Sequence, residues 1–408
     1  MNERKNILYL SYDGMTDPLG QSQVLPYIVG LSKAGYSFSL ISFEKKHRFQ
    51  QYRSIIEDIC KRHNIKWYPL SFSSRPPFVS KLWDVYRMKQ KAKELHTKYN
   101  FSMTHCRSYQ SAEVGLFLKQ KFGVKFFFDM RGFWVDERVD GNLWNMENPF
   151  YKWAYNFYKK KEASFIHYSD IIISLTEAGK REIQKWKSYQ HTPIGVIPCS
   201  ADFELFSLTN DLHKKKAREL LGLPDNSIVM SYLGSIGTWY LLEEMLDFFK
   251  QLKLKYPNAK FLFITPTDKE EVINIAKFKS IAREDIVVKF AKRNEVTSLM
   301  KASDFSIFFI KPAYSKIASS PTKLGELFAM GLPVVCNDKV GDVGEIITQS
   351  QSGILVETFT TESYDQAIQL LPKYLDLSPS FIRSQSESYY KLDNAIQSYV
   401  EHYQSILS

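Results

Sequence analysis

The sequence lacks a long hydrophobic run and has little cysteine. None of its 408 residues belongs to an uncharged apolar stretch of about 18 residues, which excludes an ordinary membrane-spanning helix. The apolar run within residues 1–14 is too short for a signal peptide, so we expect the protein to stay in the cytoplasm, either free or peripheral on the inner face of the membrane. No two cysteines have metal-knuckle spacing, and we expect four reduced, mostly buried thiols: Cys60, Cys106, Cys199 and Cys336.

Negative charge is scarce in the first half of the chain. Residues 1–200 contain 31 Lys and Arg against 18 Asp and Glu, whereas residues 201–408 contain 23 against 26. This asymmetry predicts an anionic partner for the first half: a nucleic acid, an acidic substrate or a phospholipid surface. We expect no nucleic acid, because no nucleic-acid-binding module is present. Basic and aromatic residues alternate around 81–98 and 151–161, which suits an anionic membrane surface or plain solvated helix faces equally.

Apolar strands alternate with amphipathic helices along both halves of the chain. This pattern predicts an α/β fold with two doubly wound, Rossmann-like domains that face each other across a cleft. We expect an acceptor-side domain over residues 1–200 and a nucleotide-binding domain over 201–380, joined by a linker near 198–212. Residues 381–408 are predicted to form a closing helix that packs back on the first domain. In such sheets, ligands bind beyond the carboxyl ends of the strands.

Residues 319–335 predict a helix with a defined start and stop, followed directly by a strand. Ser320 suits the N-cap, Pro321 the first helical position and Gly331 the C-terminal stop. Gly325 lies inside this helix, where glycine costs about 1 kcal/mol relative to alanine. We therefore expect a group to approach the helix backbone closely at Gly325.

The first turn of this helix has the character of an anion site. Its free N–H groups and the helix dipole favour a phosphate. Lys323 is unfavourable there for the helix alone, so a bound phosphate explains it better than a snorkelling lysine on a core helix. Glu326 lies one turn after Thr322 on the same face, where its carboxylate could accept hydrogen bonds from a ribose diol.

Three further stretches follow predicted strands and could face a ligand. Residues 232–240 place Gly234 and Gly237 between a strand and a helix, where a backbone turn could approach a phosphate, and Gly20 follows the first strand. A plain tight turn or loop would explain each of these glycines as well. Residues 128–138 deliver charged side chains at a strand end, which indicates contacts with an acceptor or a diphosphate, or else a local ion-pair cluster. The acceptor-side candidates at this and the preceding strand end are Asp129, Arg131, Asp136, His105 and Arg107.

With these stretches in order, the chain resembles the family 4 glycosyltransferases of the GT-B fold, over most of residues 5–345 and the closing helix. Residues 19–38 look like that family's glycine loop and first helix, and residues 169–176 and 196–206 look like its interdomain signature. The stretch 319–335 is similar to the second half of its E-x7-E motif. The chain departs from the family at Ala318, where the first glutamate would stand, at Ser235, where an arginine is usual, and at Arg131, where a histidine is usual.

The resemblance implies a retaining transfer of a sugar from a nucleotide-sugar donor to a glycan or lipid-linked acceptor in surface polysaccharide or glycoconjugate synthesis. Glu326 is then the implied ribose-binding glutamate. The sequence contains no D-x-D, the carboxylate pair that holds the metal in the other large glycosyltransferase fold, so we predict no cofactor and no required Mg²⁺ or Mn²⁺. The predicted catalytic residues are Arg131, Asp129 and Lys323, and the predicted donor-binding residues are Gly20, Gly234, Ser235, Gly237, Lys311, Ser320, Thr322, Lys323, Leu324 and Glu326.

Two other functions remain open at this point. A nucleotide-sugar 2-epimerase shares the two-domain architecture and would turn over the donor without an acceptor. A non-catalytic partner of a transferase, which binds a nucleotide sugar or only a membrane, is kept open by Ala318 and Ser235. The sequence does not identify the base, the sugar or the acceptor.

Overall fold

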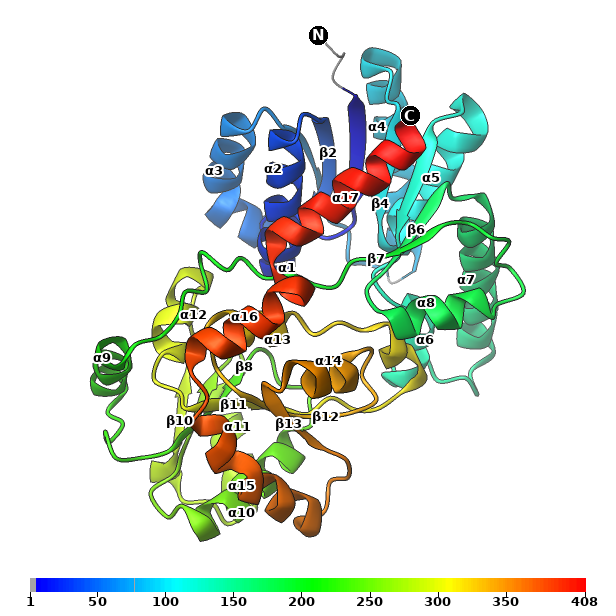
Figure 1. The fold of residues 1–408 in the computed structure, drawn as a ribbon. Coiled ribbons are helices and arrows are strands. Elements are labelled where there is room, and N and C mark those ends of the chain that lie inside the picture. The colour runs from blue at the N-terminus through cyan, green and yellow to red at the C-terminus, as the bar shows by residue number, and fades with distance from the viewer. Residues whose placement is uncertain (1–4, 77) are drawn as a thin grey trace. The chain divides into compact units, whose positions relative to one another are not determined.

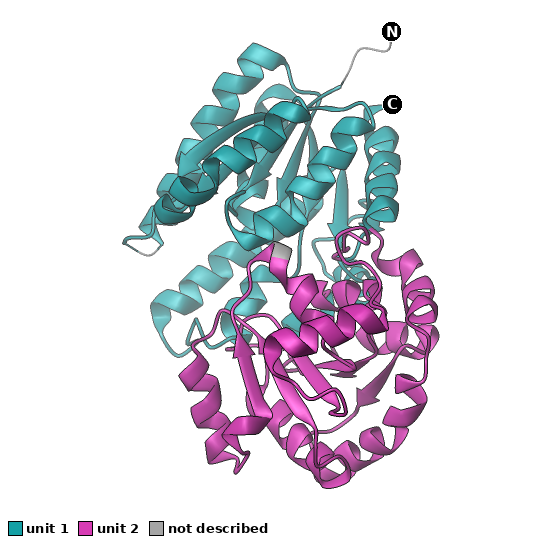
Figure 2. Cartoon of the chain, turned by 90° about the vertical axis from the view of Figure 1, so that its left-hand side faces the viewer, with its two compact units in different colours: residues 1–198, 314–319, 392–408 teal, residues 199–313, 320–391 magenta. Residues whose placement is uncertain are grey.

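The computed structural model describes residues 5–76 and 78–408, and these divide into two compact units. Unit 1 comprises residues 1–198, 314–319 and 392–408, and unit 2 comprises residues 199–313 and 320–391 (Figure 2). In the described part of the chain, we find no helix with both the length and the apolarity needed to cross a membrane. All four cysteines are buried free thiols.

Unit 1 contains a seven-stranded sheet in which every neighbouring pair is parallel (Figure 1). The strand order is β3-β2-β1-β4-β5-β6-β7, so the direction of winding reverses between β1 and β4. Most of its strands are near-continuous apolar runs, as expected where helices cover both faces. The strands are β1 (Asn6–Ser11), β2 (Ser37–Glu44), β3 (Lys66–Ser71), β4 (Met103–Arg107), β5 (Lys125–Asp129), β6 (Ile171–Ser174) and β7 (Ile194–Val196).

Helices connect these strands and supply the rest of the unit 1 core. They are α1 (Pro18–Gln23), α2 (Leu25–Lys33), α3 (Lys46–Arg62), α4 (Val79–Tyr99), α5 (Ser108–Phe122), α6 (Trp134–Asp140), α7 (Pro149–Tyr168), α8 (Glu177–Gln184) and α17 (Leu392–Leu407), with the 3-10 turn η2 (Tyr314–Ala318). Each crossover helix runs back against its parallel strands, so it begins at the edge where the strands end. That edge is where a doubly wound domain carries its site.

Unit 2 repeats the architecture with six parallel strands in the order β10-β9-β8-β11-β12-β13. They are β8 (Val229–Leu233), β9 (Lys260–Ile264), β10 (Ile286–Lys289), β11 (Phe305–Phe308), β12 (Val334–Asn337) and β13 (Gly353–Val356). The helices are α9 (Asp211–Leu221), α10 (Leu242–Lys255), α11 (Lys269–Phe278), α12 (Arg293–Met300), α13 (Thr322–Ala329), α14 (Val343–Ser350), α15 (Thr361–Leu375) and α16 (Pro379–Tyr390), with the 3-10 turn η1 (Arg283–Asp285). The predicted class, α/β with two doubly wound Rossmann-like domains, is confirmed.

The C-terminal segment differs from the single closing helix predicted over residues 381–408. It forms two helices, because Lys391 has an extended backbone with φ −68° and ψ 126°. α16 stays in unit 2, where the ring of Tyr390 packs on Gly325, and only α17 belongs to unit 1. There α17 lies along α2, where Ile396 fills the space left by Gly30.

A second difference concerns residues 314–319, which were predicted to lie in the 201–380 domain but group with unit 1. Polar contacts fix this turn to α6 and α8. Ser315 N donates to Asp140 Oδ2 at 2.8 Å, Lys316 Nζ lies 2.8 Å from Glu137 Oε1, and Tyr314 OH donates to Glu182 Oε1 at 3.0 Å. The domain is therefore interrupted between β11 and α13.

Candidate functional site

In unit 2, the winding direction reverses between β8 and β11, and Lys323 lies at that point. Its ammonium nitrogen is 4.3 Å from the centre of the Tyr232 ring, 3.5 Å from that of Tyr240 and 5.7 Å from that of Phe308. Tyr232 belongs to β8 and Phe308 to β11. α13 therefore delivers a cation to the carboxyl ends of the two strands where ligands bind in such sheets.

The Lys323 ammonium has aromatic neighbours but no hydrogen-bond acceptor among the described residues. The side chain is buried, and burial lowers the pKa of Lys323 well below its usual value, against the smaller attraction of Glu326. Leaving a buried cation without an acceptor costs several kcal/mol, and cation–π contacts recover only about 2 kcal/mol each. An anionic ligand oxygen at this position would offset that cost.

The loop after β8 forms one wall of the cage around the Lys323 ammonium. Gly234 and Gly237 have φ values of +123° and +149°, which other residues rarely adopt. A Cβ on Gly234 would lie 3.1 Å from Lys323 Nζ. Tyr232 OH donates to the carbonyl of Ser235 at 2.6 Å and so fixes the loop over the lysine. Of the two predicted glycines, Gly234 lies beside Lys323, whereas a Cβ on Gly237 would have no neighbour within 4 Å, and Ser235 contributes its carbonyl to the loop.

The start of α13 differs from the prediction by one to two residues. The helix begins at Thr322 with Pro321 as N-cap, and no side chain caps it. Ser320 does not cap it, because its Oγ accepts a hydrogen bond from Cys199 N at 3.1 Å. Leu324 was predicted to bind the sugar donor. Its N–H, however, donates to the carbonyl of Pro321 at 3.0 Å and is already used within the chain.

The close approach predicted at Gly325 is made by protein. A Cβ there would lie 3.0 Å from the Tyr390 side chain, so this glycine serves the packing of α16. The stop at Gly331 is confirmed, with φ +74° just after the C-cap Met330. Lys311 follows β11 directly, and its N–H donates to the carbonyl of Trp239 at 2.9 Å, which ties the two loops at the switch point together.

Glu326 lies one turn beyond Lys323 on the buried side of α13, and its partner is Arg293. Arg293 Nη1 is 3.3 Å from Glu326 Oε1. Burial raises the pKa of Glu326, and Arg293 and Lys323 oppose that rise. Sequence reasoning missed Arg293, because the first residue of a short helix 33 positions away gives no signal of this pairing.

In unit 1, the acceptor-side candidates gather at the ends of β4 and β5. Asp129 Oδ2 lies 3.4 Å from His105 Nε2 and 3.9 Å from Arg107 Nη1, and Asp129 Oδ1 lies 3.8 Å from Arg131 Nη1. Burial would raise the pKa of Asp129, but Arg131, His105 and Arg107 together hold it below its usual value. The structure brings these four predicted residues into one cluster. Arg131 sits in the left-handed region with φ +59°, a conformation that costs a non-glycine residue about 1–3 kcal/mol.

Two tyrosines of α17 complete this cluster, and no local sequence pattern identifies them. Tyr403 OH is 2.6 Å from His105 Nδ1, and Tyr399 OH donates to Asp129 Oδ2 at 3.3 Å. Burial lowers the pKa of His105, whose two ring nitrogens lie between the Tyr403 hydroxyl and the Asp129 carboxylate. α17 thereby orients both the histidine and the carboxylate.

Asp136 does not join this cluster through any contact recorded in the described residues. Its carboxylate instead accepts from Tyr155 OH at 2.9 Å and pairs with Lys159 Nζ at 3.1 Å, both on α7. Ala318 is buried in η2, where its Cβ would meet a Cβ on Gly179 at 3.1 Å.

Gly20 has a structural role inside unit 1. A Cβ on Gly20 would lie 2.1 Å from the carbonyl oxygen of Gly14 and 2.7 Å from Met15 Cα. α1 therefore packs directly against the loop that follows β1. This contact alone accounts for the glycine.

Gly20→Ala is therefore expected to destabilise the ligand-free protein by at least about 2 kcal/mol, since backbone must move to make room for the methyl group. Thermal denaturation without ligand measures this, with Ser22→Ala in the same helix as the control. Unchanged stability together with weaker nucleotide binding would show instead that Gly20 serves the ligand.

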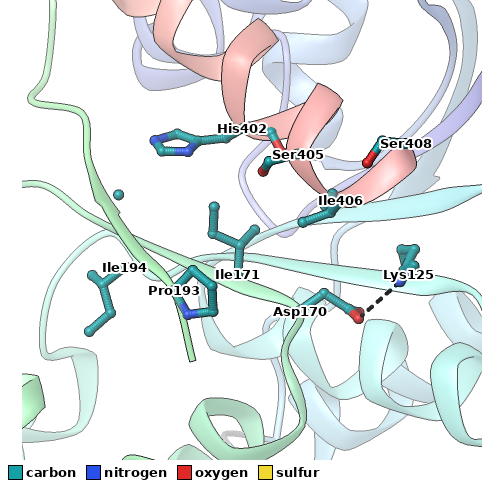
Figure 3. Close-up of a pocket in the computed structure, with 10 residues that line it drawn as sticks. Lys125, Asp170, Ile171, Pro193, Ile194, His402, Ser405, Ile406 and Ser408 are labelled. Atoms are coloured by element: carbon teal, nitrogen blue, oxygen red, sulfur yellow. Dashed lines mark hydrogen bonds and ion pairs between the residues drawn. The ribbon is translucent and has the colours of Figure 1, made fainter. Parts of the chain in front are cut away.

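A cavity of about 430 Å³ lies between the start of β5, the segments entering β6 and β7, and α17 (Figure 3). Lys125, Asp170 and Pro193 line one side, and His402 and Ile406 the other. It opens at the amino ends of the strands, the edge opposite Asp129. Within residues 5–76 and 78–408, no three His, Cys, Asp or Glu side chains are grouped so that they could hold a metal ion.

Residues 213–377 match the family described as glycosyl transferases group 1. No curated protein matches the sequence. Among solved structures, the chain is similar to sucrose-phosphate synthase from Thermosynechococcus elongatus, with TM-score 0.72, 14% identity and 99% of each chain covered. It is also similar to Anabaena HepE in complex with UDP and glucose, with TM-score 0.70, 13% identity and 98% and 99% covered. UDP-GlcNAc 2-epimerase from Neisseria meningitidis matches with TM-score 0.58, 14% identity and 99% and 100% covered.

Proposed function

We propose that this chain, a glycosyltransferase with the GT-B fold and a group 1 glycosyl transferase domain in residues 213–377, transfers a sugar from a nucleoside diphosphate sugar to a glycan or lipid-linked acceptor in surface polysaccharide or glycoconjugate synthesis. We further propose family 4 membership and a transfer that retains the anomeric configuration and requires no metal. The observation that carries the proposal is the buried ammonium of Lys323, which has no acceptor among the described residues and lies at the switch point of unit 2.

In this proposal, the diphosphate of the donor lies against Lys323. The glycosidic C–O bond breaks as the diphosphate leaves, so negative charge grows on the phosphate oxygens. The preorganised hydrogen-bond donors to that charge are Lys323, the uncapped start of α13 at Thr322 and the Gly234–Gly237 backbone. These groups would stabilise the leaving diphosphate in place of a metal ion. HepE, which has the same fold, was solved with UDP, which supports a nucleoside diphosphate here.

Glu326 would accept hydrogen bonds from the ribose hydroxyls, with Arg293 holding its carboxylate in place. In unit 1, Arg131 would face the acceptor or the transferring sugar. Asp129 is buried and its Oδ1 lies 3.8 Å from Arg131 Nη1, so we propose that it positions Arg131 rather than touching the substrate.

The direct test is turnover in the presence of EDTA, followed by NMR of the product. We expect nucleoside diphosphate release that depends on an acceptor, is unchanged by EDTA, and yields the anomeric configuration of the donor. Activity that EDTA abolishes and Mg²⁺ or Mn²⁺ restores would contradict metal independence. Donor conversion to an epimer without any acceptor would identify a 2-epimerase, and donor binding without turnover across an acceptor panel would identify a non-catalytic partner.

A further inference from the structure

Large apolar side chains are exposed where α4 and α7 begin. We name this set the α4/α7 apolar surface, and its members are exposed by 41–57%: Val79, Leu82, Trp83, Tyr86, Phe150 and Trp153. Phe78 joins the two helices, since its ring centre lies 5.6 Å from those of both Phe150 and Trp153. Isolated exposed apolar residues are ordinary, but a contiguous group of aromatic and aliphatic side chains marks an interaction surface.

The same helices carry a strong positive charge. α4 and α7 together contain ten Lys and Arg against three Asp and Glu. Two of the three acidic side chains, Asp84 and Glu162, are buried and paired with Arg87 and Lys159. The charge that faces solvent is therefore almost entirely positive.

Apolar and basic residues are both exposed on each helix. On α4, the exposed face is apolar from Val79 to Tyr86 and then becomes charged, with Lys93 and Lys98 exposed. On α7, exposed Lys152 lies between Phe150 and Trp153, and exposed Lys160 follows them. The side chains of Lys89 and Lys91 lie over the rings of Phe117 and Tyr68. Both helices thus combine exposed aromatic side chains at their starts with exposed lysines.

We infer that the α4/α7 apolar surface docks on an anionic phospholipid bilayer. Trp, Tyr, Phe and Leu side chains suit the boundary between headgroups and acyl chains. Each lysine near an anionic membrane surface adds about 1 kcal/mol of attraction. A nucleic acid whose bases stack on the aromatic rings would not account for the exposed aliphatic side chains of Val79 and Leu82. A neutral protein partner would not account for the positive charge of the surface.

This surface lies at the edge of unit 1 that also carries Asp129 and Arg131. α4 follows β3 and α7 follows β5 and α6, so both begin where the strands end. The inference deepens the proposed function and rests on it in one respect: it assigns a lipid-linked acceptor, whose tail stays in the bilayer while its polar head reaches the Asp129 cluster. The docking itself requires no turnover and can be tested without it.

The experiment is flotation of the full-length protein with phosphatidylcholine vesicles that contain either none or 30% phosphatidylglycerol. We expect binding to the anionic vesicles at least tenfold stronger than to the neutral ones, and weaker binding in high salt. Trp83→Ser/Trp153→Ser should reduce binding to anionic vesicles at least tenfold, and Lys152→Glu/Lys160→Glu should do so independently.

The matched controls lie in unit 2. Leu254→Ser/Phe278→Ser removes side chains that are 76% and 84% exposed, and Lys215→Glu/Lys216→Glu reverses two exposed charges on α9. Both controls should bind like the wild type. Thermal denaturation checks folding, and stabilisation by nucleoside diphosphates should persist in all four variants, so loss of docking and failure of the proposed function give different results.

Three results would overturn the inference. The first is equal or absent binding to the two vesicle types, and the second is equal loss of binding in the controls. The third is a wild-type dimer that Trp83→Ser/Trp153→Ser converts to a monomer, which would assign the surface to a second copy of the chain.

Discussion

Lys323→Met is expected to stabilise the ligand-free protein and to remove most of its affinity for a nucleoside diphosphate. Methionine fills the cage between Tyr232 and Tyr240 without the buried charge, and such replacements stabilise proteins by up to about 1–4 kcal/mol. The same change removes a charged hydrogen bond to phosphate worth about 1.5–3 kcal/mol, or roughly 10–150-fold in affinity. Turnover should fall further, by about 10²–10³-fold, since charge develops on the leaving diphosphate.

Denaturation and nucleotide titration of the same preparation measure both effects, with Lys289→Met, at the exposed last residue of β10, as the control. The pH dependence gives an additional readout. Burial lowers the pKa of Lys323 in the folded protein. The folded protein therefore loses the proton of the Lys323 ammonium at a lower pH than the unfolded chain, which keeps it up to about pH 10.4. Stability should therefore rise with pH between the lowered and the ordinary pKa, and Lys323→Met should remove that rise. Near-normal turnover in Lys323→Met would contradict the assignment.

Asp129→Asn is expected to destabilise the protein by about 3–5 kcal/mol, because it removes the buried negative charge that Arg107 and Arg131 share. Tyr399→Phe should cost less, about 1.5–3 kcal/mol, since it removes one hydrogen bond to that carboxylate. Thermal or urea denaturation compares them, with Asp58→Asn in an exposed helical pair as the control.

The pH dependence of Asp129→Asn follows from the lowered pKa of Asp129. The carboxylate stabilises the fold fully above the unfolded value of about 3.9, and this contribution disappears as the pH falls through the lower folded pKa. Asp129→Asn should therefore be less sensitive to acid than the wild type. Equal stability of the variant and the wild type at neutral pH would show that the cluster is not held together by this charge.

The sheets could be predicted because their strands are continuous apolar runs bounded by turns. β5 (Lys125–Asp129) and β9 (Lys260–Ile264) are examples of such runs. β13 is harder to recognise, since Gly353–Val356 is short and begins with a glycine. The break at Lys391 and the insertion of residues 314–319 into unit 1 depend on tertiary packing, which the local pattern does not encode.

The candidate site was predictable where a residue type is energetically unfavourable in its local secondary structure. Lys323 in a first helical turn and Gly234 directly after a strand are unfavourable without a ligand, and the structure brings these two residues together. Gly325 and Gly20 carry similar costs, but Tyr390 and Gly14 account for them. Arg293, Tyr399 and Tyr403 act through contacts distant in sequence, so no local signal identifies them.

The central claim, that unit 2 binds a nucleoside diphosphate through Lys323, is tested most directly by thermal denaturation of the wild type and Lys323→Met with UDP, GDP, ADP and their common sugars in EDTA. A nucleotide at 100 times its dissociation constant stabilises the protein that it binds by about 2.7 kcal/mol. The account predicts such a shift for one nucleotide with the wild type and a much smaller shift with Lys323→Met. No shift with any nucleotide, or equal shifts in the two proteins, would contradict it.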